Sequence, residues 1–180
     1  MHFEFATAGR IVFGDGVAAT LGREAAALGR RAFVLTGGRP EAHAELLRLL
    51  ADHHVAYTPF RVTREPTTEL AAEAVARAAA NGCDVVVGIG GGSVIDAGKA
   101  VAALLANGGD IVDYLEVVGR GQALGRPSAP YIAVPTTAGT GAEVTRNAVL
   151  ESPRHRVKVS MRSPYMLPQL ALVDTELTPS

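Results

Sequence analysis

Residues 84–99 (DVVVGIGGGSVIDAGK) contain an apolar run that leads into consecutive glycines, a serine and an amphipathic segment. The run 83–89 predicts a buried strand, and an apolar stripe from Ser93 to about Asn107 predicts a helix. Backbone amides converge at such a junction, because the first amides of a helix have no partner within it. The junction therefore predicts a phosphate or pyrophosphate site, and the ligand it favours is a nucleotide.

The glycine cluster at this junction excludes one class of nucleotide site. No Lys-Ser or Lys-Thr pair follows a glycine at the P-loop spacing, which disfavours ATP hydrolysis. Gly90, Gly91 and Gly92 fit the Gly-x-Gly-x-x-Gly pattern only in part, because Ser93 replaces its last glycine. Two alternatives stay open: the cluster is a plain tight turn, or Ser93 and Asp96 form a helix cap and Asp96 has no further role.

Predicted strands and helices alternate along the chain. Short apolar runs at 31–36, 55–62, 83–89, 131–134 and 170–173 predict strands, and the segments 17–28, from Pro40 onward, 69–80 and 93–107 predict helices. Strands that are apolar on both sides, with helices between them, are typical of a doubly wound parallel sheet. We therefore expect an α/β, Rossmann-like domain over residues 1–180.

Three segments do not follow this alternation. Residues 3–6 and 10–13 flank a Thr-Ala-Gly turn and predict a hairpin at a sheet edge. Residues 147–150 and 157–160 alternate around a Ser-Pro turn and predict a second, peripheral hairpin. The segment 110–126 has little periodicity and predicts a surface loop with a short helix.

Charge and cysteine content limit the partners of the chain. Its 17 basic and 18 acidic residues give a net charge of −1, so it lacks the basic field of a nucleic-acid-binding protein. The single cysteine, Cys83, fits a reducing cytoplasm, and no apolar run approaches the ~20 residues that span a bilayer. Five scattered histidines suggest no complete metal site. We expect a cytoplasmic protein with small-molecule partners and neither nucleic-acid nor membrane binding.

A second polar loop follows the predicted strand 131–134. Thr136, Thr137 and Thr140 lie just beyond this strand, at the edge where open α/β sheets bind ligands. Their hydroxyl groups can donate to ribose or phosphate oxygens. The alternative is an ordinary turn rich in small polar residues.

The turn after the predicted strand 31–36 bears on which nucleotide binds. Dinucleotide-binding folds often place an acidic residue here, against the ribose 2′-hydroxyl, but this chain has Gly37. A glycine leaves room for a 2′-phosphate, and Arg39 is placed to pair with it. The alternative is that Arg39 is a solvated side chain in a turn.

Several segments together resemble the iron-containing (group III) alcohol dehydrogenases. They are GIGGGSVIDAGK ending at Lys99, PTTAGTGAEVT ending at Thr145, Lys158, and ALVDTELT ending at Thr178. The resemblance implies a dehydroquinate synthase-like N-terminal domain that binds NAD or NADP. It implies that the pyrophosphate is held by Gly91, Gly92 and Ser93, the adenine and ribose side by Thr136, Thr137 and Thr140, and the nicotinamide half by Asp96, Val149 and Lys158.

Two differences from members of that family limit the function that we expect of this chain. Members are roughly twice as long, and their iron or other divalent metal is bound by a helical C-terminal domain that this chain lacks. NAD-preferring members usually carry Asp at the position of Gly37. We thus expect this chain to be the cofactor-binding half of a metal-dependent NAD(P) alcohol dehydrogenase that interconverts small alcohols and aldehydes or ketones. We expect the chain to be inactive alone and to form a homo-oligomer. The alternative is a stand-alone nucleotide-binding module that regulates or scaffolds a partner.

Overall fold

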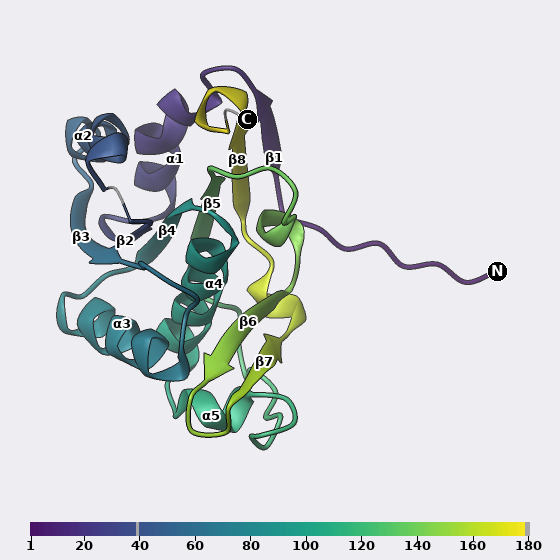
Figure 1. Ribbon diagram of the computed structural model, residues 1–180. Coiled ribbons are helices and arrows are strands. Elements are labelled where there is room, and N and C mark those ends of the chain that lie inside the picture. Colours follow the sequence, from purple (N-terminus) through teal and green to yellow (C-terminus); the bar gives the residue numbers. More distant parts are fainter. Residues whose placement is uncertain (39, 179–180) are drawn as a thin grey trace.

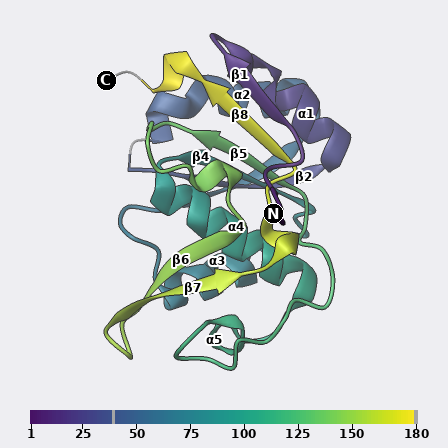
Figure 2. The same cartoon turned by 90° about the vertical axis from the view of Figure 1, so that its right-hand side faces the viewer.

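The computed structural model describes residues 1–38 and 40–178 and contains two sheets (Figures 1 and 2). The larger is a six-stranded parallel sheet with the order β1-β8-β5-β4-β2-β3. Its strands are β1 Ile11–Gly14, β2 Arg31–Thr36, β3 Ala56–Arg61, β4 Val85–Gly90, β5 Tyr131–Pro135 and β8 Leu170–Asp174. The smaller is the antiparallel pair of β6 Asn147–Ser152 and β7 Val157–Arg162. The predicted α/β fold with an outlying hairpin is confirmed.

Helices cover both faces of the parallel sheet (Figure 1). The α-helices are α1 Leu21–Leu28, α2 Ala44–Asp52, α3 Thr68–Ala80, α4 Gly92–Asn107 and α5 Ile111–Tyr114. The 3-10 turns are η1 Val17–Thr20, η2 Pro40–His43, η3 Ala142–Val144, η4 Pro164–Met166 and η5 Thr175–Leu177. Helices α1 and α2 pack on one face and α3 and α4 on the other, which is the doubly wound arrangement.

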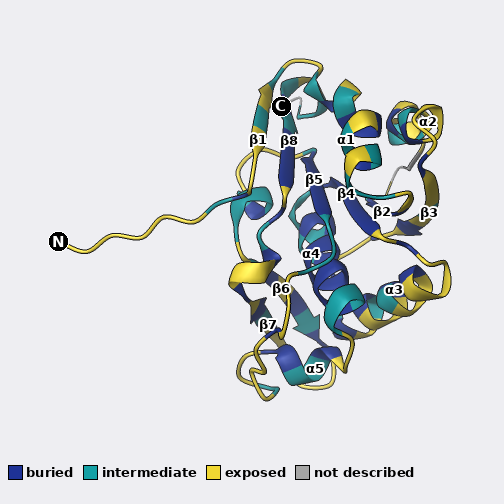
Figure 3. Cartoon of the chain, turned by 180° about the vertical axis from the view of Figure 1, so that it is seen from behind, coloured by how far each residue is buried: buried dark blue, intermediate teal, exposed yellow. Residues whose placement is uncertain are grey.

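Strand β4 lies inside the sheet, and all six of its residues are buried (Figure 3). Val85 and Val87 join the apolar cluster on the side of α1 and α2, whereas Val86 joins the cluster on the side of α3 and α4. Successive side chains of a strand point to opposite faces, so a strand covered on both faces has a continuous apolar sequence. This burial fixes where β4 ends, and with it the position of the glycine cluster.

Helix α4 is buried on two sides, because the β6–β7 hairpin packs against its outer face. Ala100, Leu104, Ala148 and Leu150 belong to one buried cluster. The hairpin is also tied to the loop before α3, since the amide of Glu151 donates to the carbonyl of Pro66 at 2.9 Å. The hairpin and α4 together place β6 beside the start of the helix.

The predicted N-terminal hairpin is wrong. Residues 3–6 form no strand and are exposed, and the N-terminal segment extends away from the domain (Figure 1). Strand β1 instead pairs in parallel with β8, and the amides of Gly9 and Arg10 donate to the carbonyls of Pro168 and Gln169. The turn segment is thus held by the chain before β8, and β1 still lies at an edge of the sheet, as predicted.

The second predicted hairpin is confirmed as β6 and β7, and the loop 110–126 contains the short helix α5. The predicted helix 17–28 is divided into η1 and α1. None of the helices in residues 1–38 and 40–178 has the length and apolarity that crossing a bilayer requires.

Candidate functional site

The glycine cluster forms the junction between β4 and α4. Gly91 is the N-cap of the helix, and its carbonyl accepts hydrogen bonds from the amides of Val94 and Ile95 at 3.0 and 3.1 Å. The amides of Gly92 and Ser93 precede these first helical bonds, so they are available to a ligand. A helix N-terminus that follows glycines at the carboxyl edge of a parallel sheet favours an anion.

The threonine loop lies directly against this junction. The amide of Thr136 donates to the carbonyl of Gly90 at 3.0 Å, which joins the ends of β5 and β4. A Cβ atom at Gly91 would lie 3.2 Å from Thr137 Oγ1, and one at Gly92 would lie 3.2 Å from Thr140 Cγ2. The structure therefore brings the two predicted loops together, and glycine permits their close approach.

A cavity of about 320 Å³ lies on the α4 side of the junction, and we call it the lysine-side cavity. It is lined by Glu65, Pro66, Gly92, Ser93, Asp96, Thr140, Ala142, Thr145, Asn147, Val149, Glu151 and Lys158. Six of these residues were predicted from the sequence: Gly92, Ser93, Asp96, Thr140, Val149 and Lys158. At its mouth Lys158 Nζ lies 2.6 Å from Glu65 Oε1, which links β7 to the loop before α3.

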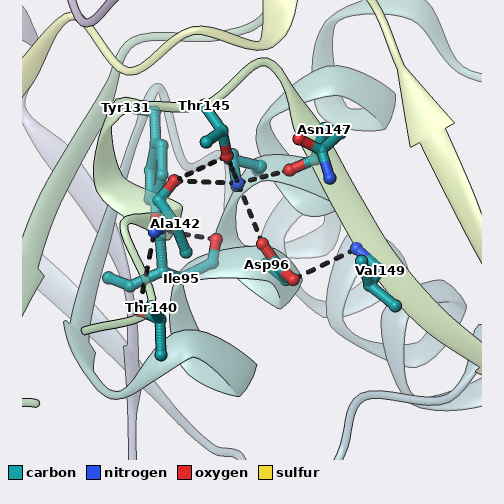
Figure 4. A network of polar contacts seen from close by, with 9 residues as sticks. Ile95, Asp96, Tyr131, Thr140, Ala142, Thr145, Asn147 and Val149 are labelled. Carbon is teal, nitrogen blue, oxygen red and sulfur yellow. Dashed lines mark hydrogen bonds and ion pairs between the residues drawn. The ribbon is translucent and has the colours of Figure 1, made fainter.

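A buried lysine, Lys99, contacts several residues that line this cavity, and Figure 4 shows the polar contacts among them. The side chain of Lys99 has no exposed surface, and its Nζ donates to Ala142 O at 2.9 Å, to Thr145 Oγ1 at 3.1 Å and to Asn147 O. It also pairs with Asp96 Oδ1 at 2.8 Å. Burial lowers the pKa of Lys99, and the carboxylates of Asp96 and Glu143 oppose that shift. The network ties α4 to η3 and to the start of β6.

Asp96 is part of that network, and the interpretation of Ser93 and Asp96 as a helix cap is wrong. The cap residue is Gly91, with no side-chain cap bond. Asp96 Oδ2 accepts a hydrogen bond from the amide of Val149 at 3.1 Å, while Oδ1 pairs with Lys99 (Figure 4). The carboxylate is drawn toward β6 because a buried ammonium and a strand amide lie there and donate to its two oxygens.

A second cavity, of about 530 Å³, lies on the opposite side of the glycine cluster, and we call it the glycine-side cavity. It is lined by Gly37, Gly38, Ala42, His43, Gly90, Gly91, Thr136, Glu176 and Leu177. Four of these, Gly37, Gly90, Gly91 and Thr136, were predicted from the sequence. A Cβ atom at Gly37 would meet no atom within 4 Å, so the turn after β2 has open space beside it. Arg39, the other residue predicted there, lies outside the described residues.

Sequence reasoning gave no role to Lys99, Glu65, Asn147 or His43. Of these, only Lys99 could have been predicted from the sequence. It stands three positions after Asp96 on a largely apolar helix, which is the spacing of an ion pair within a helix. The others reach the cavities from loops and elements that are distant in sequence.

The described residues do not fit a resident metal ion. Within 1–38 and 40–178 there is no group of three or more His, Cys, Asp or Glu side chains that would hold one.

With this geometry established, comparison with known proteins identifies the family. Residues 8–175 match the family described as iron-containing alcohol dehydrogenase. The chain belongs to that family. The family resemblance of the glycine and threonine segments is thus confirmed over nearly the whole sequence.

Two of its relatives illustrate the range of proteins it matches. It is 40% identical over 113 residues to 4-hydroxybutyrate dehydrogenase of Cupriavidus necator, covering 63% of this chain and 29% of that protein. It is 34% identical over 179 residues to the mitochondrial hydroxyacid-oxoacid transhydrogenase of Xenopus tropicalis, covering 96% of this chain and 38% of that one. The chain therefore spans well under half the length of these relatives.

Solved structures agree with the fold. A 1,3-propanediol oxidoreductase superposes with a TM-score of 0.91 at 28% identity, covering 99% of this chain and 47% of that one. Sulfoacetaldehyde reductase from Bifidobacterium kashiwanohense, solved in complex with NAD+, superposes with a TM-score of 0.88 at 31% identity, with coverages of 99% and 47%. The chain thus corresponds to one half of these enzymes.

Proposed function

We propose that this chain binds a nicotinamide dinucleotide across the glycine cluster and forms the cofactor-binding half of an alcohol dehydrogenase. One observation carries the proposal: two cavities flank Gly90–Gly92, and both are lined by residues from the carboxyl edge of the sheet. A dinucleotide has two nucleoside halves joined by a pyrophosphate. The glycine cluster is suited to the pyrophosphate and the cavities to the two halves.

The residues divide between the halves as follows. The amides of Gly92 and Ser93 bind the pyrophosphate, with Gly91 beside it. The family resemblance assigns Thr137 and Thr140 to the adenine and ribose side, but they lie against Gly91 and Gly92, so their hydroxyl groups are proposed to contact the pyrophosphate instead. The adenosine half occupies the glycine-side cavity with Gly37, Gly90 and Thr136, and Arg39 is proposed to contribute there. The nicotinamide half occupies the lysine-side cavity with Asp96, Val149 and Lys158. When bound, the nicotinamide ring supplies the hydride acceptor or donor for a small alcohol or its carbonyl product.

Three wider expectations are part of the same proposal. The metal centre of the complete enzyme belongs to a helical half outside these 180 residues. The complete enzyme is a cytoplasmic homo-oligomer that acts on small alcohols and aldehydes or ketones. The names of the relatives, such as sulfoacetaldehyde reductase and 4-hydroxybutyrate dehydrogenase, support this substrate class.

Calorimetric titration of the chain with NADPH, NADH and ATP tests the proposal. We expect saturable binding of a nicotinamide dinucleotide with one site per chain, and no competing affinity for ATP. Selective binding of ATP, or a dinucleotide that a crystal places away from Gly90–Gly92, would contradict it.

A further inference from the structure

An arginine from the neighbouring strand reaches the turn of the glycine-side cavity. Arg61 is the last residue of β3 and is paired in register with Thr36, the last residue of β2. Its Nη2 donates a hydrogen bond to the carbonyl of Gly38. The guanidinium therefore lies against the turn after β2, although Arg61 is distant from that turn in sequence.

The turn offers space but no acidic group at the position of Gly37. Neither Gly37 nor Gly38 would bring a Cβ atom within 4 Å of a neighbour. A ribose 2′-hydroxyl at this turn would lack the carboxylate that usually follows the strand and accepts its hydrogen bond. Glu176, an acidic residue of the same lining, follows β8 and not β2. A larger, negatively charged substituent on the ribose would instead meet open space beside a cation.

His43 lines the same cavity but does not supply that cation. Its Nδ1 is buried and has no hydrogen-bond partner among the described residues. Burial lowers the pKa of His43, so the ring is neutral near pH 7. Within residues 1–38 and 40–178, the permanent positive charge that contacts the turn is that of Arg61.

We propose that Arg61 binds the 2′-phosphate of NADPH and gives the site its preference for the phosphorylated dinucleotide. This inference rests on the proposed function. The guanidinium exchanges a neutral acceptor, the Gly38 carbonyl, for phosphate oxygens, and charge-assisted bonds of this kind are about twice as strong as neutral ones. The planar fork of arginine also matches a phosphate with two parallel donors.

Titrations of NADPH and NADH into the wild type, Arg61→Gln and Arg64→Gln test this role. We expect the wild type to bind NADPH more tightly than NADH. Arg61→Gln should weaken NADPH binding by about 10- to 100-fold and leave NADH binding within about twofold, as loss of one charged hydrogen-bonding partner predicts. Arg64→Gln removes the same charge from an exposed site three residues further on, and should change neither affinity.

Competition with 2′,5′-ADP and 5′-AMP locates the effect on the ribose. The wild type should prefer 2′,5′-ADP, and Arg61→Gln should lose most of that preference, whereas Arg61→Lys should keep more of it. Equal weakening of NADPH and NADH by Arg61→Gln would show that Arg61 only holds the turn, and would overturn the inference. An Arg61→Gln variant that binds both dinucleotides as tightly as the wild type does would overturn it as well. A wild type that binds neither dinucleotide would instead refute the proposed function itself.

Discussion

The two cavities beside the glycine cluster are built in opposite ways. The lysine-side cavity has charged side chains at its base and at its mouth, held by Lys99 and by the Lys158–Glu65 pair. The glycine-side cavity is formed largely by main chain and small residues, with open space beside Gly37. The form of the lysine-side cavity therefore depends on interactions between side chains, and the space in the glycine-side cavity depends on the lack of a side chain at its glycines. Removing a buried side chain should destabilise the first cavity, and adding a side chain should change what the second cavity binds.

The two lysines of the chain, both beside the lysine-side cavity, differ in how far they are buried. Lys99 exposes none of its side chain, whereas Lys158 exposes 60% of its own. A buried ammonium must find partners inside the protein, because water does not reach it. An exposed ammonium remains solvated with or without its partner, so its ion pair contributes little to stability.

Lys99→Met should have the largest effect of the changes considered. It leaves Asp96 without its ammonium partner and removes one donor from the carbonyl groups of Ala142 and Asn147. Loss of one member of a buried ion pair costs about 3–5 kcal/mol. Urea denaturation should show this loss of the free energy of unfolding. Arg48→Met, which removes an exposed i,i+4 pair with Asp52, is the matched control and should cost less than about 1 kcal/mol. Equal losses in the two variants would contradict the role given to Lys99.

Gly91→Val should obstruct the glycine cluster between the two cavities. The new Cβ would lie 3.2 Å from Thr137 Oγ1, and the branches beyond it would occupy space needed for close approach of the pyrophosphate. We expect NADPH and NADH to lose about a hundredfold in affinity together, or ~2.7 kcal/mol. Calorimetry measures this loss. Gly125→Val, in a loop where the nearest atom is 3.9 Å away, is the control and should bind both normally.

Local sequence patterns were sufficient for most of the fold. Strand β4 is apolar on both faces because it lies inside the sheet, and the β6–β7 hairpin has a short turn between alternating segments. The prediction of a strand at residues 3–6 was wrong because a strand forms only where another strand is available to pair with it. That partner for β1 is β8, about 160 positions further along the chain.

The candidate site was predictable where it follows strand ends. Gly91 and Thr136 were found because parallel strands bring their carboxyl ends to one edge. The Lys99 network was not found, since its acceptors lie in η3 and at the start of β6, more than 40 positions away, and the sequence does not specify how the chain returns to α4. His43 and Arg61 were missed for the same reason: neither belongs to a glycine or threonine segment.

Gly37→Asp adds a side chain to the open space of the glycine-side cavity, and it tests whether that space selects the cofactor. The new Cβ meets no atom within 4 Å, so stability should not change. Its carboxylate should repel a 2′-phosphate and accept a hydrogen bond from a 2′-hydroxyl, which shifts the NADPH to NADH affinity ratio toward NADH by about tenfold, or ~1.4 kcal/mol. Titrations of both dinucleotides measure the ratio. A variant that keeps the wild-type ratio would place the adenosine ribose away from Gly37.

The Lys158–Glu65 pair should show the smallest effect. Its side chains are 60% and 52% exposed, and ion pairs of this kind contribute about 0.2–1 kcal/mol despite the short contact. A double-mutant cycle with Lys158→Met and Glu65→Gln, measured by urea denaturation, isolates that coupling from the effect of each single change. Added salt should reduce it further, because solvent-exposed charges are screened. A salt-independent coupling as large as the loss in Lys99→Met would mean that the mouth of the lysine-side cavity is as firmly held as its base.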